Sequence, residues 1–353
     1  MVPLLILILC FGSASNQNLG RAPTSLSELS GENLVNYINS AQSEFVAENN
    51  DFHKRYPAMH KKYAAANPDQ DEEIPVENAT LSKLPSHFDS RERWPHCGSM
   101  RYIRDQGHCG SCWAFAVAEV ISDRTCIRTR GADSPILSAE DILTCCGKQC
   151  GSGCDGGYPV EALKWWRNKG VVTGGDYGGE GCEPYSIRPA LEEAFGMATP
   201  RCKKYCQKRY HKKYLKDKRH GESVYKMSRN SKAIMSEIFL NGPVTATFEV
   251  YEDLYKYRHG IYHHVGGKHL GAHAVKIIGW GTENHQDYWI IANSWGVHFG
   301  ERGFMRVRRG NNECGIEGEV LAGRARNRGK EDSVEEETSN ETEDLSSAEL
   351  QFL

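Results

Sequence analysis

A cysteine that opens an apolar stretch is the clearest candidate for chemistry in this chain. Cys112 is followed by apolar residues whose spacing predicts a helix with one buried face: Trp113, Phe115, Val117, Val120 and Ile121. A thiol at a helix N-terminus faces unpaired backbone N–H groups and the positive end of the helix dipole, which favours thiolate over thiol. Gln106 lies six residues earlier and can supply a side-chain N–H to an oxyanion. The pattern therefore predicts a nucleophilic cysteine.

The spacing of Cys109 and Cys112 also fits other chemistry. A C-x-x-C pair occurs in thioredoxin-type redox centres and in half of many zinc sites, and its cysteines can also belong to plain disulfides. A nucleophile, by contrast, needs a histidine to accept the thiol proton and a third group to orient the imidazole. The rest of the chain must supply both.

Five histidines lie from His259 to His273. His263 and His264 belong to a segment that contains Gly and Lys, and we expect them to face solvent. His273 differs because it opens the β-rich run 274–281, which ends in a turn signal. We therefore place His273 at the mouth of a predicted strand.

Three segments, in this order, resemble the papain-like cysteine proteases: residues 106–115, the run that begins at His273, and residues 288–296. The resemblance implies that His273 is the catalytic base, that Asn293 orients its imidazole, and that Trp295 shields their hydrogen bond from water. A buried core histidine and a turn asparagine are the structural alternative. His273 and Asn293 follow Cys112 by more than the roughly 130–150 residues typical of papain, so we expect an insertion between the two halves.

Further motifs resemble the cathepsin B branch of that family: residues 84–89, 145–150, 153–158, 182–187 and 314–319. This resemblance implies that main-chain groups of Gly156 and Gly157 hold the substrate as an extended strand. Ala272 and Trp295 would lie beside the substrate. Glu319 would form the floor of the pocket for the side chain two positions before the scissile bond, where Arg or a large apolar residue is accepted. An ordinary surface glutamate is the alternative for that position.

Two departures from the cathepsin B pattern bear on specificity. The stretch from Arg188 to Pro200 lacks the cysteine and the His-His pair with which that branch binds a substrate's C-terminal carboxylate. The departure predicts mainly endopeptidase activity rather than removal of C-terminal dipeptides. Phe299 stands where the family usually carries a tryptophan, which affects packing on the side of the leaving group.

The chain has thirteen cysteines, and so many indicate an oxidising compartment. One of them, Cys10, lies in an N-terminal apolar stretch. The resemblance implies that Cys112 is the free nucleophile and that Cys314 is a buried free thiol. It also implies five disulfides: Cys97–Cys126, Cys109–Cys154, Cys145–Cys202, Cys146–Cys150 and Cys182–Cys206. A bridged Cys109 cannot be the redox partner of Cys112, so this pairing removes the thioredoxin interpretation.

The N-terminal region is typical of a secretory precursor. An apolar run followed by small residues predicts a signal peptide of residues 1–15, too short for a bilayer span of about 20 residues. The polar residues 16–83 resemble the short cathepsin B propeptide, which crosses the cleft backwards and blocks it; a disordered linker is the alternative. We expect a lysosomal or extracellular protein without a membrane span, with glycosylation sequons at Asn78 and Asn340.

The net charge of −3 conceals strong segregation. The run from Arg201 to Arg219 holds ten Lys or Arg and a single acidic residue, Asp217. Such a run usually forms a solvated face, and binding of a heparin-like glycosaminoglycan is the functional alternative; nucleic acid is not expected in a secretory chain. The tail 331–353 has nine acidic and no basic residues, and its composition predicts disorder.

The periodicity of the chain predicts an α+β fold. We expect helices at 138–144, 160–169 and 231–240, and strands at 244–250, 274–280, 288–292 and 303–307. Ser138 and Asp141 form the expected cap pair of the first of these helices. With the resemblance, residues 84–330 become a papain-like two-lobed unit, with a helical left lobe, a β-barrel-like right lobe and the active-site cleft between them. Such an enzyme is a monomer that cleaves proteins and peptides, is bound by cystatin-type inhibitors, and needs no metal or organic cofactor. A non-catalytic binding protein on the same scaffold is the alternative.

Overall fold

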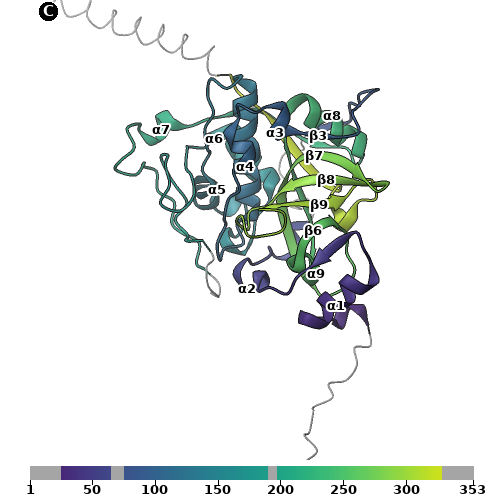
Figure 1. The fold of residues 1–353 in the computed structure, drawn as a ribbon. Coiled ribbons are helices and arrows are strands. Elements are labelled where there is room, and N and C mark those ends of the chain that lie inside the picture. Colours follow the sequence, from purple (N-terminus) through teal and green to yellow (C-terminus); the bar gives the residue numbers. More distant parts are fainter. Residues whose placement is uncertain (1–24, 65–74, 190–196, 328–353) are drawn as a thin grey trace, which may run out of the picture.

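Helices and strands occupy different sides of the structure, a computed structural model (Figure 1). It describes residues 25–64, 75–189 and 197–327. Helices α4, α5 and α6 lie on one side and the strands β6 to β9 on the other, which confirms the α+β prediction. The predicted signal peptide, Cys10 and the acidic tail with Asn340 lie outside the described residues.

The helical side is built around α4 (Cys112–Arg128). Its residues are buried on all sides from Cys112 to Cys126, so the prediction of one buried face was wrong. The reason is that α5 (Ala139–Cys145), α6 (Pro159–Lys169) and the sheet enclose it. The Ser138 hydroxyl accepts a hydrogen bond from the Asp141 N–H at 2.9 Å, which confirms the predicted cap of α5.

The strands form one mixed sheet in the order β1-β6-β9-β8-β7-β5-β10-β4-β2, with β3 paired to β7. Their bounds are β1 Phe45–Ala47, β2 Val76–Glu77, β3 Phe88–Asp89, β4 Gly221–Met227, β5 Val244–Tyr251, β6 Tyr257–Tyr262, β7 His269–Glu283, β8 Gln286–Ala292, β9 Phe304–Arg308 and β10 Glu319–Ala325. The pairing order ends at β1 and β2, so the sheet is open rather than a closed barrel. The strands therefore do not form the β-barrel-like lobe that the sequence led us to expect.

The strand predictions were right for β5, β8 and β9 to within one or two residues. β7 is longer than predicted and begins at His269, so His273 lies inside a strand rather than at its mouth. β4, β6 and β10 were not predicted. The remaining helices are α1 Gly31–Ala41, α2 Phe52–Arg55, α3 Ser90–Arg93, α7 Tyr214–Asp217, α8 Ser231–Asn241 and α9 Glu252–Lys256. None of the helices within the described ranges is long and apolar enough to cross a bilayer.

The sheet separates two hydrophobic cores. Ala272 and Ala274 of β7 belong to the core that contains Cys112 and the other buried residues of α4, whereas Val275 and Ile277 belong to the core on the opposite face. This alternation is the period of two expected of a strand that is buried on both faces. β7 is therefore the element that joins the helical side to the sheet.

A buried lysine reinforces this junction. The Lys276 ammonium on β7 lies 3.0 Å from the Asp123 carboxylate and 3.4 Å from that of Glu119, both on α4. All three side chains are shielded from solvent. Burial raises the pKa of Glu119 to about 7, against the attraction of Lys276. These three side chains therefore link α4 to β7.

We expect Lys276→Met to lower the free energy of unfolding by about 3–5 kcal/mol, because it leaves two buried carboxylates without their cation. Urea unfolding followed by circular dichroism measures the change. Lys232→Met, at an exposed lysine of α8, is the matched control and should change stability by less than about 0.5 kcal/mol. A loss below about 1 kcal/mol for Lys276→Met would show that the junction does not depend on this cation.

Candidate active site

Cys112 is the first residue of α4 and its thiol is fully buried. The Ser111 carbonyl accepts hydrogen bonds from the N–H groups of Ala114 and Phe115. These bonds form the first turn of the helix, which carries the thiol. Across the sheet junction, the N–H of Ala274 donates to the Cys112 sulfur at 3.5 Å. The start of α4 thus lies against β7 one residue beyond His273.

His273 and Asn293 are hydrogen-bonded inside the protein. The distance between His273 Nε2 and Asn293 Oδ1 is 2.7 Å, and the same amide oxygen accepts from the N–H of Ser294. An amide oxygen only accepts, so Nε2 carries the proton and Nδ1 is left without one. His273 Nδ1 is buried and has no hydrogen-bond partner among the described residues. It can therefore take up a proton.

Trp295 covers this hydrogen bond. Its ring lies 4.6 Å from the His273 ring, centroid to centroid, and is itself fully buried. Tyr255 stacks on the indole with ring centroids 4.6 Å apart, and Phe299 packs against it nearly perpendicularly at 4.9 Å. Phe299 therefore replaces the usual tryptophan of the family with another aromatic ring, and this ring packs on Trp295.

Gln106 is held on both sides of its amide. Its Nε2 donates to the Cys109 carbonyl at 2.8 Å, and its Oε1 accepts from the Ser294 hydroxyl at 2.8 Å. These bonds fix which end of the amide is the donor. Because an NH₂ group has two hydrogens, one remains for a further acceptor. Gln106 is therefore oriented before any substrate binds.

The glycines of the predicted substrate strand are required by their surroundings. A Cβ atom at Gly157 would lie 2.6 Å from the Trp113 ring, and one at Gly156 would lie 2.5 Å from the Tyr63 ring. Gly156 also has a φ of 123°, which side-chain-bearing residues rarely adopt. The backbone can approach its neighbours here only because both residues lack a side chain.

Residues 56–63 cover these groups. The N–H of Met59 donates to the Ala272 carbonyl at 2.8 Å, and the N–H of Ala272 donates to the Met59 carbonyl at 2.9 Å. Tyr63 lies against Gly156 and donates to the Ser152 hydroxyl at 2.9 Å. The segment therefore uses the main chain of Ala272 and the space over Gly156, which are two of the positions predicted to bind substrate.

The same segment is anchored by an aromatic residue. The Tyr56 hydroxyl donates to Asp105 at 2.9 Å, and its ring stacks on Trp295 with centroids 6.0 Å apart. Just before it, Phe52 meets the edge of Phe299 at 5.6 Å. Sequence reasoning missed these residues, because nothing local in the sequence indicates which aromatic residues of 16–83 meet the site.

Burial favours the uncharged forms of both Cys112 and His273 in this structure. Burial raises the pKa of the Cys112 thiol to about 12, although backbone N–H groups of Ala274, Trp113 and Cys112 act in the opposite direction. Burial also lowers the pKa of His273 to about 4, against its hydrogen bond to Asn293. Both shifts favour the neutral pair in the covered state.

Glu319 and Lys226 form an ion pair. Glu319 is the first residue of β10, and the Lys226 ammonium from β4 contacts its carboxylate. Both side chains are partly buried, so Glu319 is not an ordinary surface residue. Sequence reasoning missed Lys226, because its pairing depends on the register of two strands far apart in the chain.

The structure contains the five disulfides that the resemblance implied: Cys97–Cys126, Cys109–Cys154, Cys145–Cys202, Cys146–Cys150 and Cys182–Cys206. Among the described cysteines, Cys112 and the partly buried Cys314 are free. The sequon residue Asn78 is exposed and accepts a hydrogen bond from the Ser228 hydroxyl.

Two histidines that were expected to face solvent pack against other groups. The His263 side chain is 13% exposed, meets the edge of the Phe45 ring and lies 3.6 Å from the Glu44 carboxylate. His264 Nδ1 lies 3.0 Å from the Asp253 carboxylate. The expectation was wrong because the two histidines directly follow β6, which lies among other packed elements. For His263 the neighbouring element is β1, which pairs with β6.

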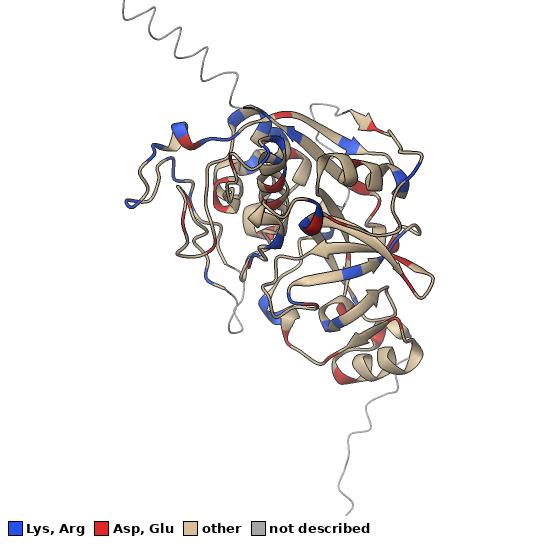
Figure 2. Ribbon diagram, turned by 45° about the horizontal axis from the view of Figure 1, so that its top comes forward, with Lys and Arg blue, Asp and Glu red and all other residues tan. Residues whose placement is uncertain are grey.

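The basic run forms an arm around α7, where Lys and Arg gather in Figure 2. Its last two cations are not solvated, because Lys218 pairs with Asp141 at 2.7 Å and Arg219 pairs with Asp133 and Asp217. The other eight are exposed: Arg201, Lys203, Lys204, Lys208, Arg209, Lys212, Lys213 and Lys216. Binding of a heparin-like glycosaminoglycan through this arm stays a prediction.

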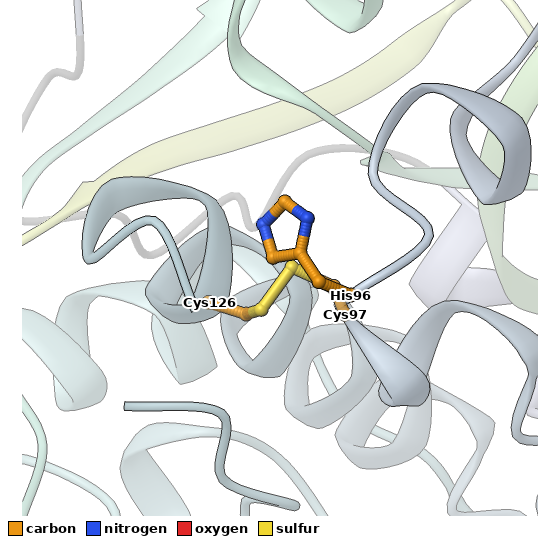
Figure 3. A group of neighbouring side chains, drawn as sticks. All are labelled: His96, Cys97 and Cys126. Atoms are coloured by element: carbon orange, nitrogen blue, oxygen red, sulfur yellow. A yellow bond between two sulfur atoms is a disulfide. The ribbon is translucent and has the colours of Figure 1, made fainter. Parts of the chain in front are cut away.

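Two groups of described side chains have the spacing of metal ligands. In one of them His96 lies beside the disulfide between Cys97 and Cys126 (Figure 3). The other combines Asp141 and Glu183 with Cys145, which is bridged to Cys202. Sulfur binds metal as thiolate, and a bridged sulfur is not one. Neither group therefore offers three free ligands.

Comparison with known proteins agrees with this geometry. Residues 84–324 match the papain family cysteine protease domain. The chain is 51% identical over 307 residues to a gut-specific cysteine proteinase of Caenorhabditis elegans, a match that covers 86% of this chain and 93% of the relative. It is 48% identical over 319 residues to cathepsin B-like cysteine proteinase 3 of the same organism, covering 88% and 84% of the two chains.

A solved structure extends the likeness to the region before residue 84. Procathepsin B S9 from Trypanosoma congolense is 33% identical, with a TM-score of 0.71, and the match covers 84% of this chain and 98% of that one. From the family match and these relatives, the chain is a cysteine peptidase that belongs to the papain family and resembles its cathepsin B-like members.

Proposed function

We propose that Cys112 is the nucleophile and His273 the general base of this peptidase. The observation that carries the proposal is the buried His273–Asn293 hydrogen bond, which leaves an unprotonated Nδ1 on the residue next to the one that contacts the Cys112 sulfur. In the uncovered site, transfer of the thiol proton to Nδ1 gives a thiolate and an imidazolium. Asn293 keeps the ring in position during this transfer.

The reaction then follows from the positions of these groups. The Cys112 thiolate attacks the peptide carbonyl, and the Cys112 N–H and the free Gln106 hydrogen stabilise the resulting oxyanion. The His273 imidazolium gives its proton to the leaving amine, which departs and leaves an acyl-enzyme. Water, deprotonated by His273, hydrolyses the thioester and restores the thiol. No metal or organic cofactor takes part in these steps.

The protein is made, in this proposal, as a secreted zymogen in which residues 16–83 are the inhibitory propeptide. The two-way hydrogen bonds between Met59 and Ala272 and the contact of Tyr63 with Gly156 support this role. The family match begins at residue 84, which supports the boundary. A lysosomal or extracellular residence and cystatin-type inhibitors as partners follow from the same resemblance.

Substrate binding is proposed to use the groups that the propeptide covers. Gly156, Gly157 and Ala272 would bind the substrate main chain, with Trp295 beside them. The pocket that ends at Glu319 would accept Arg or a large apolar side chain two positions before the scissile bond. Cleavage within folded proteins, with the cleaved bonds identified by mass spectrometry, tests the activity and this preference together.

We expect the processed enzyme to cleave inside peptides and not to need a free C-terminus. The stretch from Arg188 to Pro200, of which residues 190–196 lie outside the described part, has no His-His pair to bind a carboxylate. Amidation of a substrate's C-terminus should therefore change kcat/KM by less than about twofold. In an enzyme that binds the carboxylate, amidation would remove that interaction and cost about 2–5 kcal/mol. Loss of cleavage on amidation would show that another group binds the carboxylate and that the enzyme is an exopeptidase.

A further inference from the structure

Glu319 stands at the end of a row of residues that leads across the sheet to the catalytic thiol. Glu319 of β10 is paired with Thr247 of β5, and Thr247 is paired with Ala274 of β7. Directly paired residues of antiparallel strands point to the same face and lie about 5 Å apart. Ala274 is the residue whose N–H contacts the Cys112 sulfur. Glu319 is therefore about 10 Å from Ala274, on the face of the sheet that packs against α4.

Lys226 lies on the same face. It is paired with Leu321, two residues beyond Glu319 on β10, and Leu321 packs in the core that contains Cys112. Lys226 and Glu319 are diagonal neighbours on adjacent strands, a distance that a lysine side chain can span. The Lys226 ammonium donates a hydrogen bond to Glu319 Oε2. The side chains of Lys226 and Glu319 are 23% and 12% exposed, so the pair is partly withdrawn from water.

The segment before residue 84 lies beside Lys226 in this structure. Val76 of β2 is paired with Lys226, and the Lys226 N–H donates to the Pro75 carbonyl. The side-chain contact is made within residues 84–330. The next cation along the chain, Arg229, donates from Nε to the Gly318 carbonyl and not to the carboxylate. Lys226 is thus placed to neutralise Glu319 in the processed enzyme as well.

We propose that Lys226 is a specificity-determining residue, which neutralises Glu319 and makes the pocket favour large apolar side chains over Arg. This inference rests on the proposed function. A substrate Arg that reaches Glu319 meets a carboxylate that Lys226 already neutralises, so it must either displace the ammonium or bring a second cation beside it, and both cost binding energy. An apolar side chain leaves the pair intact and covers it.

The test compares two peptides that differ only in Arg or Phe two positions before the scissile bond. The measured quantity is the Arg/Phe ratio of kcat/KM, which corrects for any general loss of activity. Lys226→Met should raise this ratio at least about tenfold, because Glu319 then offers an unpaired carboxylate. Lys226→Gln, which also lacks the charge, should act in the same direction if Met disturbs the strand. Lys232→Met, at an exposed lysine of α8, is the matched control.

A second pair of variants tests the charge balance. Glu319→Gln leaves Lys226 unpaired in the pocket, so the Arg/Phe ratio should fall and a peptide with Glu at that position should be cleaved better. The double variant Lys226→Met/Glu319→Gln should return the ratio to near the wild-type value. An Arg/Phe ratio that moves less than twofold in both Lys226→Met and Lys226→Gln would overturn the inference. Failure of the wild-type processed protein to cleave either peptide would instead refute the proposed function, and the inference with it.

Discussion

Replacing Cys112 with alanine should reduce kcat by more than about 10³-fold, and replacing His273 with alanine should have an effect of the same order. In the proposed reaction, Cys112 forms the bond to the substrate carbonyl, and His273 moves the proton in both halves. Asn293→Ala should cost less, because Asn293 only orients the imidazole through its 2.7 Å hydrogen bond. The measurement is kcat on a fluorogenic peptide, with the inactive variants processed by added wild-type enzyme that is then removed.

The other free thiol provides the control. Cys314 lies in a turn before β10, outside the Cys112–His273 site, and Cys314→Ala should retain activity. An epoxide that alkylates papain-like thiolates should label Cys112 in the processed enzyme, and peptide mapping distinguishes the two cysteines. Labelling of Cys314 in place of Cys112, or full activity in Cys112→Ala, would contradict the assignment of the nucleophile.

The position of the proposed nucleophile at a helix start was predictable because its environment is local in sequence. A thiol at the first residue of a helix requires only the apolar run after it, and α4 does begin at Cys112. The cap of α5 by Ser138 was predictable for the same reason. The sequence could not show how much of α4 is buried, since that depends on α5, α6 and the sheet that enclose it.

The strands that escaped prediction have irregular patterns. β6 contains Gly260 with a φ of 104°, and β10 contains Gly323 and the exposed Arg324, so neither shows a clean alternation. Missing β4 and β10 meant missing the Lys226–Glu319 pair, because 93 residues separate the partners and only the strand register brings them together. The roles proposed for Gly156, Gly157 and Glu319 came from the family resemblance, not from periodicity.

The contacts of the covering segment were not predicted. The resemblance to the cathepsin B propeptide predicted that residues 16–83 cross the cleft, and within them α1 buries Leu34, Val35 and Ile38. The contacts that matter for the site come from Tyr56, Met59 and Tyr63, which are spaced without a regular period. Main-chain hydrogen bonds such as those of Met59 do not depend on the type of side chain, so the pattern of residue types cannot predict them.

Removal of the propeptide should increase the alkylation rate of Cys112 at neutral pH by at least about 10²-fold, because only the thiolate reacts. With the cover in place, burial raises the pKa of Cys112 to about 12 and lowers that of His273 to about 4. The thiol is then protonated at neutral pH and His273 carries no positive charge to favour the thiolate. Loss of Met59, Tyr63 and Tyr56 exposes the site to water, which favours the charged pair.

The pH profile separates protonation from simple blockage. Below a pKa of about 12 the thiolate fraction rises about tenfold per pH unit, so alkylation of the precursor should rise by about that factor from pH 7 to 8 and again to 9. In the processed enzyme the thiolate is already formed, and its rate should be nearly independent of pH over this range. Intact-mass spectrometry follows both species in one sample, because the precursor and the processed form differ in mass.

One substitution tests whether the main-chain bonds of the propeptide hold this state. Met59→Pro removes the N–H that donates to the Ala272 carbonyl, and the Met59 carbonyl can no longer be held in the same two-way contact. The precursor with this change should be alkylated at neutral pH at a rate closer to that of the processed enzyme. Lys61→Ala, at an exposed residue of the same segment, should behave as the wild type. A slow precursor rate that does not change with pH would mean that the segment excludes the reagent without neutralising the thiol, and the acid–base account of inhibition would then be wrong.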